Sequence, residues 1–157
     1  MDRSSDEITY AGIAGAVGGL LGIVGIYVGK WFSYSYVASG GKVTFYVNGS
    51  EDWTGQVAFI AGLAAVAFGI AYVLLSDPQI RTITGALMGV GGIFLLAMAL
   101  LAFTRVDETV GASPFLPGVD PGVAVRVTSQ AAGGLWISMV AGVVAVVGAF
   151  LSIRNEI

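Results

Sequence analysis

Four long apolar stretches without a charged residue constrain the fold of this chain more than any other feature. They cover residues 8–29, 53–76, 82–104 and 133–153. An α-helix rises 1.5 Å per residue, so about 20 apolar residues cross a hydrocarbon core of roughly 30 Å. Inside lipid, the α-helix is the structure in which a single segment satisfies all its own backbone hydrogen bonds. The sequence therefore predicts four transmembrane helices within one tetraspan domain, residues 1–157.

Small residues recur in every stretch at alternating intervals of three and four residues. At this spacing they share one helix face and allow two backbones to approach closely. We expect these faces to hold an antiparallel, left-handed four-helix bundle with a crossing angle of about +20°. The predicted helix-packing residues are Gly15, Gly18, Gly22, Gly25, Gly62, Gly69, Gly85, Gly89, Gly142 and Gly148.

The segment after the first stretch has the alternating pattern of a β-hairpin. Residues 33–47 alternate between two faces, and Gly40-Gly41 is the expected two-residue turn. This turn would set Tyr36 opposite Phe45. Because an isolated hairpin is only marginally stable, we expect its aromatic face to be covered by the other long connection or by a partner chain. That contact face consists of Tyr34, Tyr36, Phe45 and Val47.

A third strand is predicted at residues 123–128, which alternate in the same way. It could join the hairpin edge and complete a small antiparallel β-cap at one end of the bundle. Between the second and third helices, Asp77 is suited to cap a helix 78–104 and Pro78 to occupy its first position. The triplet that begins at Asn48 matches the glycosylation sequon, which makes Asn48 a possible glycan site.

The connections differ in their density of positive charge. Arg3, Arg81 and Arg154 lie in the two ends and the short turn, whereas four cations are spread over the long connections 30–52 and 105–132. Dense Lys and Arg in short segments favour the cytoplasmic side. We expect a multi-pass cell-membrane protein with cytoplasmic termini and extracytoplasmic long loops. Lys30-Trp31-Phe32 is expected to anchor the first helix at the interface.

The composition removes most catalytic and metal chemistry. The chain has no cysteine and no histidine, its net charge is −3, and all 17 charged residues lie outside the four stretches. We therefore expect no enzyme activity, no cofactor, no metal centre and no nucleic-acid partner. One open alternative is a calcium site formed by loop carboxylates. Its candidate ligands are Glu51, Asp52, Asp107, Glu108 and Asp120.

The predicted plan resembles that of claudin-like tetraspan proteins. The shared features are four spans, a hairpin in a long first outer loop, a tight inner turn and one strand before the fourth span. The resemblance is topological only: the chain's sole Gly-Leu-Trp (Gly134, Leu135, Trp136) opens the fourth span, and cysteines are absent. It implies a membrane scaffold whose outer sheet makes lateral or cell-to-cell contacts.

Two functions from different classes remain open at this point. The first is a non-enzymatic scaffold or accessory subunit that contacts lipid. It would assemble laterally through its glycine-rich faces and its β-cap. Its partners would be copies of itself or another membrane or surface protein. The second is a subunit of an oligomeric pore. Transporters and pumps usually carry ionisable groups within their spans, and these four stretches contain none. This favours the scaffold. Arginine is more frequent than lysine in this chain. In addition, glycine, alanine and valine are abundant. This composition is typical of prokaryotic chains.

Overall fold

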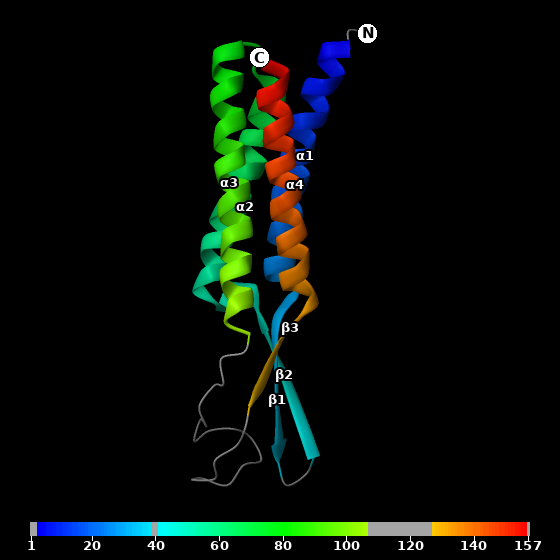
Figure 1. The fold of residues 1–157 in the computed structure, drawn as a ribbon, viewed down its shortest axis with the longest axis vertical. Helices are drawn as coiled ribbons and strands as arrows, with labels where there is room; N and C mark the ends of the chain where they lie inside the picture. Colours follow the sequence, from blue (N-terminus) through cyan, green and yellow to red (C-terminus); the bar gives the residue numbers. More distant parts are fainter. Residues whose placement is uncertain (1–2, 39–40, 107–126, 157) are drawn as a thin grey trace.

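In a computed structural model, the chain forms an elongated bundle of four antiparallel helices with a small sheet beyond one end (Figure 1). The structure describes residues 3–38, 41–106 and 127–156. Both termini lie at the end opposite to the sheet. The helices are α1 (Arg3–Tyr27), α2 (Trp53–Leu74), α3 (Pro78–Thr104) and α4 (Gly133–Glu156); the strands are β1 (Lys30–Ala38), β2 (Gly41–Asn48) and β3 (Thr128–Ala131), and a 3-10 turn η1 (Gly49–Glu51) joins β2 to α2.

The four predicted helices are confirmed. All four are long and apolar enough to cross a bilayer, which fits a multi-pass membrane protein. The tight connection between α2 and α3 forms as expected, because the Asp77 carboxylate accepts hydrogen bonds from the backbone N–H groups of Gln79 and Ile80 at 2.8 and 3.3 Å. Arg81 Nε also donates to the Leu75 carbonyl at 2.6 Å, which closes the turn from the α3 side.

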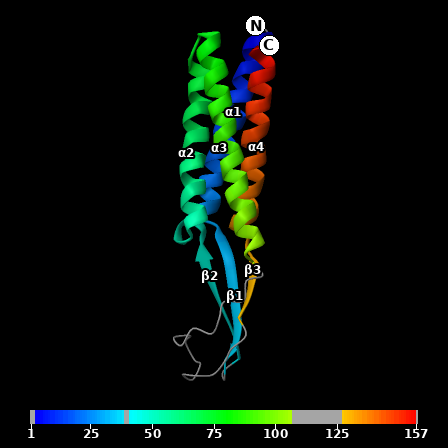
Figure 2. The same cartoon turned by 60° about the vertical axis from the view of Figure 1, so that its left-hand side comes forward.

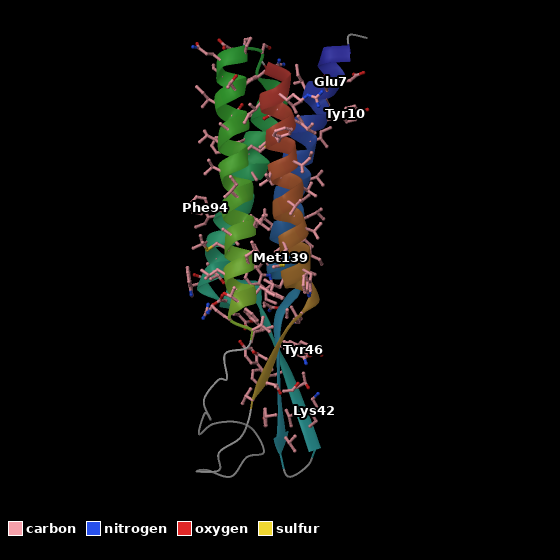
Figure 3. The ribbon with its side chains drawn as sticks, viewed as in Figure 1. Glu7, Tyr10, Lys42, Tyr46, Phe94 and Met139 are labelled. Carbon is pink, nitrogen blue, oxygen red and sulfur yellow. The ribbon has the colours of Figure 1, made fainter. Side chains whose placement is uncertain are left out.

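Each helix packs against two neighbours, in the cyclic order α1, α2, α3, α4 (Figure 2). The inside of this square is made of small residues, while large apolar side chains point outward, as Figure 3 shows for Phe94. Phe94 is 50% exposed, whereas many alanines of the interior are fully buried. Such an inside-out distribution suits a bundle surrounded by lipid tails, because lipid covers large apolar side chains as well as a protein core does.

Glycine allows α1 and α4 to touch backbone to backbone. A Cβ on Gly18 would lie 2.6 Å from the Ala145 nitrogen, and a Cβ on Gly148 would lie 2.6 Å from the Gly15 nitrogen. Either contact is shorter than real Cβ atoms show, and neither backbone can retreat without separating the helices. The contact between α1 and α4 therefore depends on missing side chains on both partners.

A second glycine face on α1 was not predicted. A Cβ on Gly12 would lie 2.7 Å from the Gly69 carbonyl oxygen, and one on Gly19 would lie 2.5 Å from the Gly62 carbonyl oxygen. Both contacts are with α2. The dense glycine content of α1 is therefore explained by two packing faces, one for α4 and α3 and the other for α2.

The sheet is three-stranded and antiparallel with the order β2-β1-β3, which confirms the predicted small antiparallel sheet. The predicted hairpin register is wrong by two positions. Tyr34 pairs with Phe45 and Ala38 pairs with Gly41, so Gly41 belongs to the ladder and not to a Gly40-Gly41 turn. Gly41 instead begins β2, with a positive φ of 121°. A shift of two residues leaves every side chain on its predicted face.

The base of the hairpin fixes this register. There Lys30 pairs with Asn48 and donates from Nζ to the Asn48 Oδ1 at 3.1 Å, while Phe32 pairs with Val47. Phe32 is almost fully buried, so it cannot slide along β2 without exposing its ring.

The third strand also begins further along the sequence than predicted. It spans Thr128–Ala131, whereas residues 123–126 of the predicted strand lie outside the described residues. Its position is set by pairing with β1 close to the helices, where Ala131 faces Phe32. The Ala132 N–H continues this ladder by donating to the Trp31 carbonyl at 2.8 Å.

The backbone contact between α1 and α4 can be tested by adding a single methyl group. We expect Gly18→Ala to destabilise the bundle by about 1–3 kcal/mol, since the new Cβ overpacks against α4 backbone. Gly133→Ala is the matched control, because a Cβ there has no neighbour within 4 Å. Unfolding of both variants in detergent should show a loss of stability for Gly18→Ala only. Equal stability would mean that α1 and α4 are not in backbone contact.

Candidate interaction site on the sheet

The sheet is joined to the bundle by a continuous apolar core. Trp31 and Phe32 of β1 pack with Ile26, Leu95 and Leu135 from three helices. Trp31 is fully buried and Phe32 is 5% exposed. The expectation that Trp31 and Phe32 anchor the chain in the lipid interface is therefore wrong, because the chain turns back into the protein after α1 and carries both rings under the sheet.

Other aromatic residues occupy the outside of the bundle near the sheet. Trp53 begins α2 and Trp136 lies in the first turn of α4, and both are about half exposed. The Trp136 ring also meets Phe103 edge-on, with 5.2 Å between ring centroids. Exposed tryptophan at one level of a bundle is typical of the membrane–water boundary. The two tryptophans therefore favour a boundary at the junction between the helices and the sheet.

The segment from β2 to η1 also packs closely against this core, through Gly49 and Gly55. A Cβ on Gly49 would lie 2.5 Å from the Trp31 ring, and a Cβ on Gly55 would collide with the Gly49 carbonyl. Next to this contact, Asn48 donates from Nδ2 to the Glu51 carboxylate at 3.1 Å while it accepts from Lys30. The sheet is therefore a fixed extension of the bundle and not a loosely attached loop.

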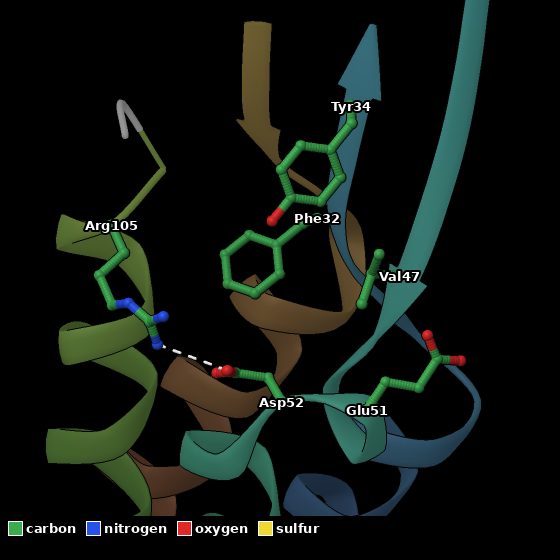
Figure 4. Close-up of a pocket in the computed structure, with 6 residues that line it drawn as sticks. All are labelled: Phe32, Tyr34, Val47, Glu51, Asp52 and Arg105. Carbon is green, nitrogen blue, oxygen red and sulfur yellow. Dashed lines mark hydrogen bonds and ion pairs between the residues drawn. The ribbon is translucent and has the colours of Figure 1, made fainter. Parts of the chain in front are cut away.

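A polar recess lies beside this junction, between the sheet and the ends of α2 and α3 (Figure 4). It is a cavity of about 140 Å³. Arg105 Nη1 lies 3.4 Å from Asp52 Oδ1, and the Thr54 hydroxyl also donates to the Asp52 carboxylate. Figure 4 shows Glu51 directed away from this ion pair. The recess is lined by Phe32, Tyr34, Val47, Glu51, Asp52 and Arg105.

The arrangement of the recess has a structural explanation. The carboxylate of Asp52 is largely buried and already has two partners, and Arg105 reaches it from the position directly after α3. The pair therefore ties the end of α3 to the start of α2. Within the described residues no group of three metal-ligating side chains occurs. Asp107, Glu108 and Asp120, which complete the calcium alternative, lie outside the described residues.

The predicted contact face of the sheet is mostly covered within the single chain. Tyr36 is 2% exposed, and Tyr34 and Val47 are half-buried. Tyr34 stacks on Phe45, with ring centroids 5.2 Å apart and planes 18° from parallel. Phe45 alone of the four remains open, at 39% exposure. This face therefore serves mainly to hold the sheet together.

The most accessible part of the sheet is β2. Six of its eight residues are exposed, including Phe45 and Tyr46, which is 57% exposed. Among the described residues, only β1 pairs with β2, so the other side of the strand presents backbone donors and acceptors without a strand partner. The sequence predicted the apolar face, but it did not predict that the edge would be the open surface.

The ten predicted packing glycines are all buried between helices of the one chain. Gly22 faces the Leu95 side chain, Gly89 faces Ala149, and Gly142 faces the Leu96 backbone. Within the single chain, all ten glycines pack against its own helices. Whether these faces also contact a neighbouring chain stays a prediction.

Asn48 is half-buried, at the end of β2. Its side-chain amide is held between Lys30 and Glu51, so a glycan would have to replace or share the bond to Glu51. Glycosylation of Asn48 stays a prediction.

Adding a methyl group at Gly49 tests whether the sheet is rigidly fixed. We expect Gly49→Ala to push the Trp31 ring out of its buried position, because the new Cβ overlaps the ring. In a background with Trp53→Phe and Trp136→Phe, the remaining Trp31 fluorescence should move to longer wavelength, and protease should cleave the hairpin faster. Ser50→Ala, one residue along in η1, is the control and should change neither signal.

Comparison of the chain with protein-family models and with curated protein sequences found no match.

Proposed function

We propose that this chain is a non-enzymatic membrane scaffold that holds a protein partner through the edge of its sheet. In this proposal the sheet lies on the extracytoplasmic side of the cell membrane, and the termini and the α2–α3 turn lie in the cytoplasm. The density of arginine in the ends and the short turn supports this orientation. The bundle is left-handed in the proposal, as expected for small residues at heptad-like spacing.

One observation carries the proposal: an open strand edge is mounted on a rigid base. β1 starts three residues after α1 ends, and only Ala132 separates β3 from α4. Trp31, Gly49 and the Asp52–Arg105 pair then fix the sheet against the helix ends. Exposed strand edges bind other strands through backbone hydrogen bonds, so a rigidly held edge is suited to binding protein rather than to chemistry.

The claudin-like plan supports the same role at the level of topology. Its implied contacts through an outer sheet fit the exposed edge of β2. The alternative, a subunit of an oligomeric pore, would need several chains, since the space between the four helices is filled by side chains such as Met88 and Leu95. No feature of the described residues favours this alternative over the scaffold.

The sheet proposal predicts that the size of native complexes depends on β2. We expect Tyr46→Ser to reduce the size of complexes extracted from the native membrane in mild detergent, because it removes an exposed aromatic ring from the edge strand. Tyr10→Ser is the matched control, since Tyr10 is 69% exposed at the opposite end of the bundle. Native electrophoresis of both variants makes the measurement, and equal complexes would contradict the role of the sheet.

Conductance separates the scaffold from the pore. Liposomes that contain only this chain should pass neither ions nor a small dye, because the proposal gives the chain no pathway across the membrane. Reproducible currents that disappear when the sheet is blocked by an antibody would replace the scaffold with the pore.

A further inference from the structure

We propose that the edge of β2 pairs antiparallel with β2 of a second copy of this chain in an opposing membrane, so that the protein joins two membranes. The inference rests on the proposed function, in which the sheet edge binds protein, and it names the partner. Its basis is the direction of the strand, the charges along it and the exposure of its edge.

β2 has few of the features that protect natural edge strands. Such strands are usually short, or carry proline, bulges or several charges. β2 has eight residues and contains no proline, and its one charged residue is Lys42. The irregularity in the hairpin lies at the base of β1, between Lys30 and Phe32, and leaves the outer edge of β2 straight. A second strand can therefore pair along most of its length.

The direction of the sheet decides which pairing is possible in which membrane. The strands run along the bundle axis and extend away from the helices (Figures 1 and 2). Two copies in one membrane point the same way, so their β2 strands could meet only in parallel. Antiparallel pairing requires one copy to be inverted, and an inverted copy with its sheet in the same space belongs to an opposing membrane.

The charges favour the antiparallel arrangement. Parallel pairing in register would place Lys42 beside Lys42, and like charges directly opposite each other destabilise a sheet. In an antiparallel pair centred on Phe45, Lys42 of one copy faces Asn48 of the other. The Asn48 side chain already binds the Lys30 ammonium group at 3.1 Å and lies beside the exposed Glu51 carboxylate. The Glu51 carboxylate on one side of Asn48 would therefore attract Lys42 of the other copy, while Lys30 on its other side stays bonded to its own Asn48.

Pairing would also convert two small sheets into one larger sheet. The order β2-β1-β3 in each copy would become a continuous six-stranded sheet, in which both β2 strands are central. Val43 and Val47 of the two copies would lie opposite each other, and the two Phe45 rings would meet at the centre. Each of these side chains lies on the same face of β2, which is the face that carries the Tyr34 ring.

Vesicle clustering with charge reversal tests this proposal. The purified full-length chain is reconstituted into vesicles of neutral lipid with the sheet outward, as checked by added protease, and clustering is followed by light scattering. Wild-type vesicles should cluster. Lys42→Glu vesicles alone and Glu51→Lys vesicles alone should cluster several-fold more slowly, because each variant places like charges opposite each other. When the two kinds of variant vesicle are mixed, the clustering rate should return toward that of the wild type. In a mixed pair, opposite charges face each other at both ends: the substituted side chain of Lys42→Glu faces that of Glu51→Lys, and Glu51 of the first variant faces Lys42 of the second.

Recovery in the mixture is the decisive result, because a variant that had merely lost its fold could not be rescued by another. No clustering of wild-type vesicles, clustering that ignores both substitutions, or a mixture that fails to recover would each overturn the proposal. Retention of the large native complexes with loss of clustering would overturn this inference alone and leave the scaffold proposal standing.

Cysteine cross-linking gives an independent readout, because the chain has no cysteine of its own. Phe45→Cys should form a disulfide-linked dimer between two vesicle populations that carry different tags, since residue 45 lies on the proposed two-fold axis. Val37→Cys is the control; Val37 is 73% exposed but lies on β1, away from the pairing edge. Cross-linking of Phe45→Cys only within one population would overturn the proposal in favour of a lateral pair.

Discussion

Backbone contact between helices is the constraint on which the rest of this structure depends. Lipid tails are as apolar as leucine, so helices gain little by burying large apolar side chains against one another in a membrane, and close packing has to hold them together. At Gly18 and Gly148 the α1 and α4 backbones touch where a single Cβ would not fit. Small residues therefore occupy the interior, and the large side chains are left for the lipid.

The order of the helices in turn determines the order of the strands. β1 follows directly from α1, and β3 leads directly into α4. Because α1 and α4 are in backbone contact, β1 and β3 emerge side by side and pair, with β2 on the far side of β1. The open edge of β2 is thus a consequence of how the bundle packs, even though no residue of β2 lies within the bundle.

Polar groups inside the bundle differ from those on the sheet in whether they already have a partner within the chain. Inside the bundle, the Tyr72 hydroxyl donates to the Ser152 carbonyl at 3.1 Å, and Ser138 donates to the Gly134 carbonyl, so these two buried hydroxyl groups have partners. At the junction, Asp52 and Arg105 satisfy each other. On the sheet, the backbone edge and the exposed side chains of β2 remain available for another molecule.

The sequence by itself determined the four helices, the hairpin with its two faces, and the capped turn at Asp77, because each depends on local periodicity or on neighbouring residues. Tertiary structure decided what depends on distant contacts. The hairpin register follows from burial of Phe32 rather than from the glycine turn, and β3 lies beside β1 because α4 lies beside α1. Trp31 has the sequence context of an interfacial anchor but is buried, since local pattern cannot reveal that the chain folds back over the helix ends. For the same reason, only the assembled fold showed that the glycine faces are occupied within the chain and that the edge of β2 is open.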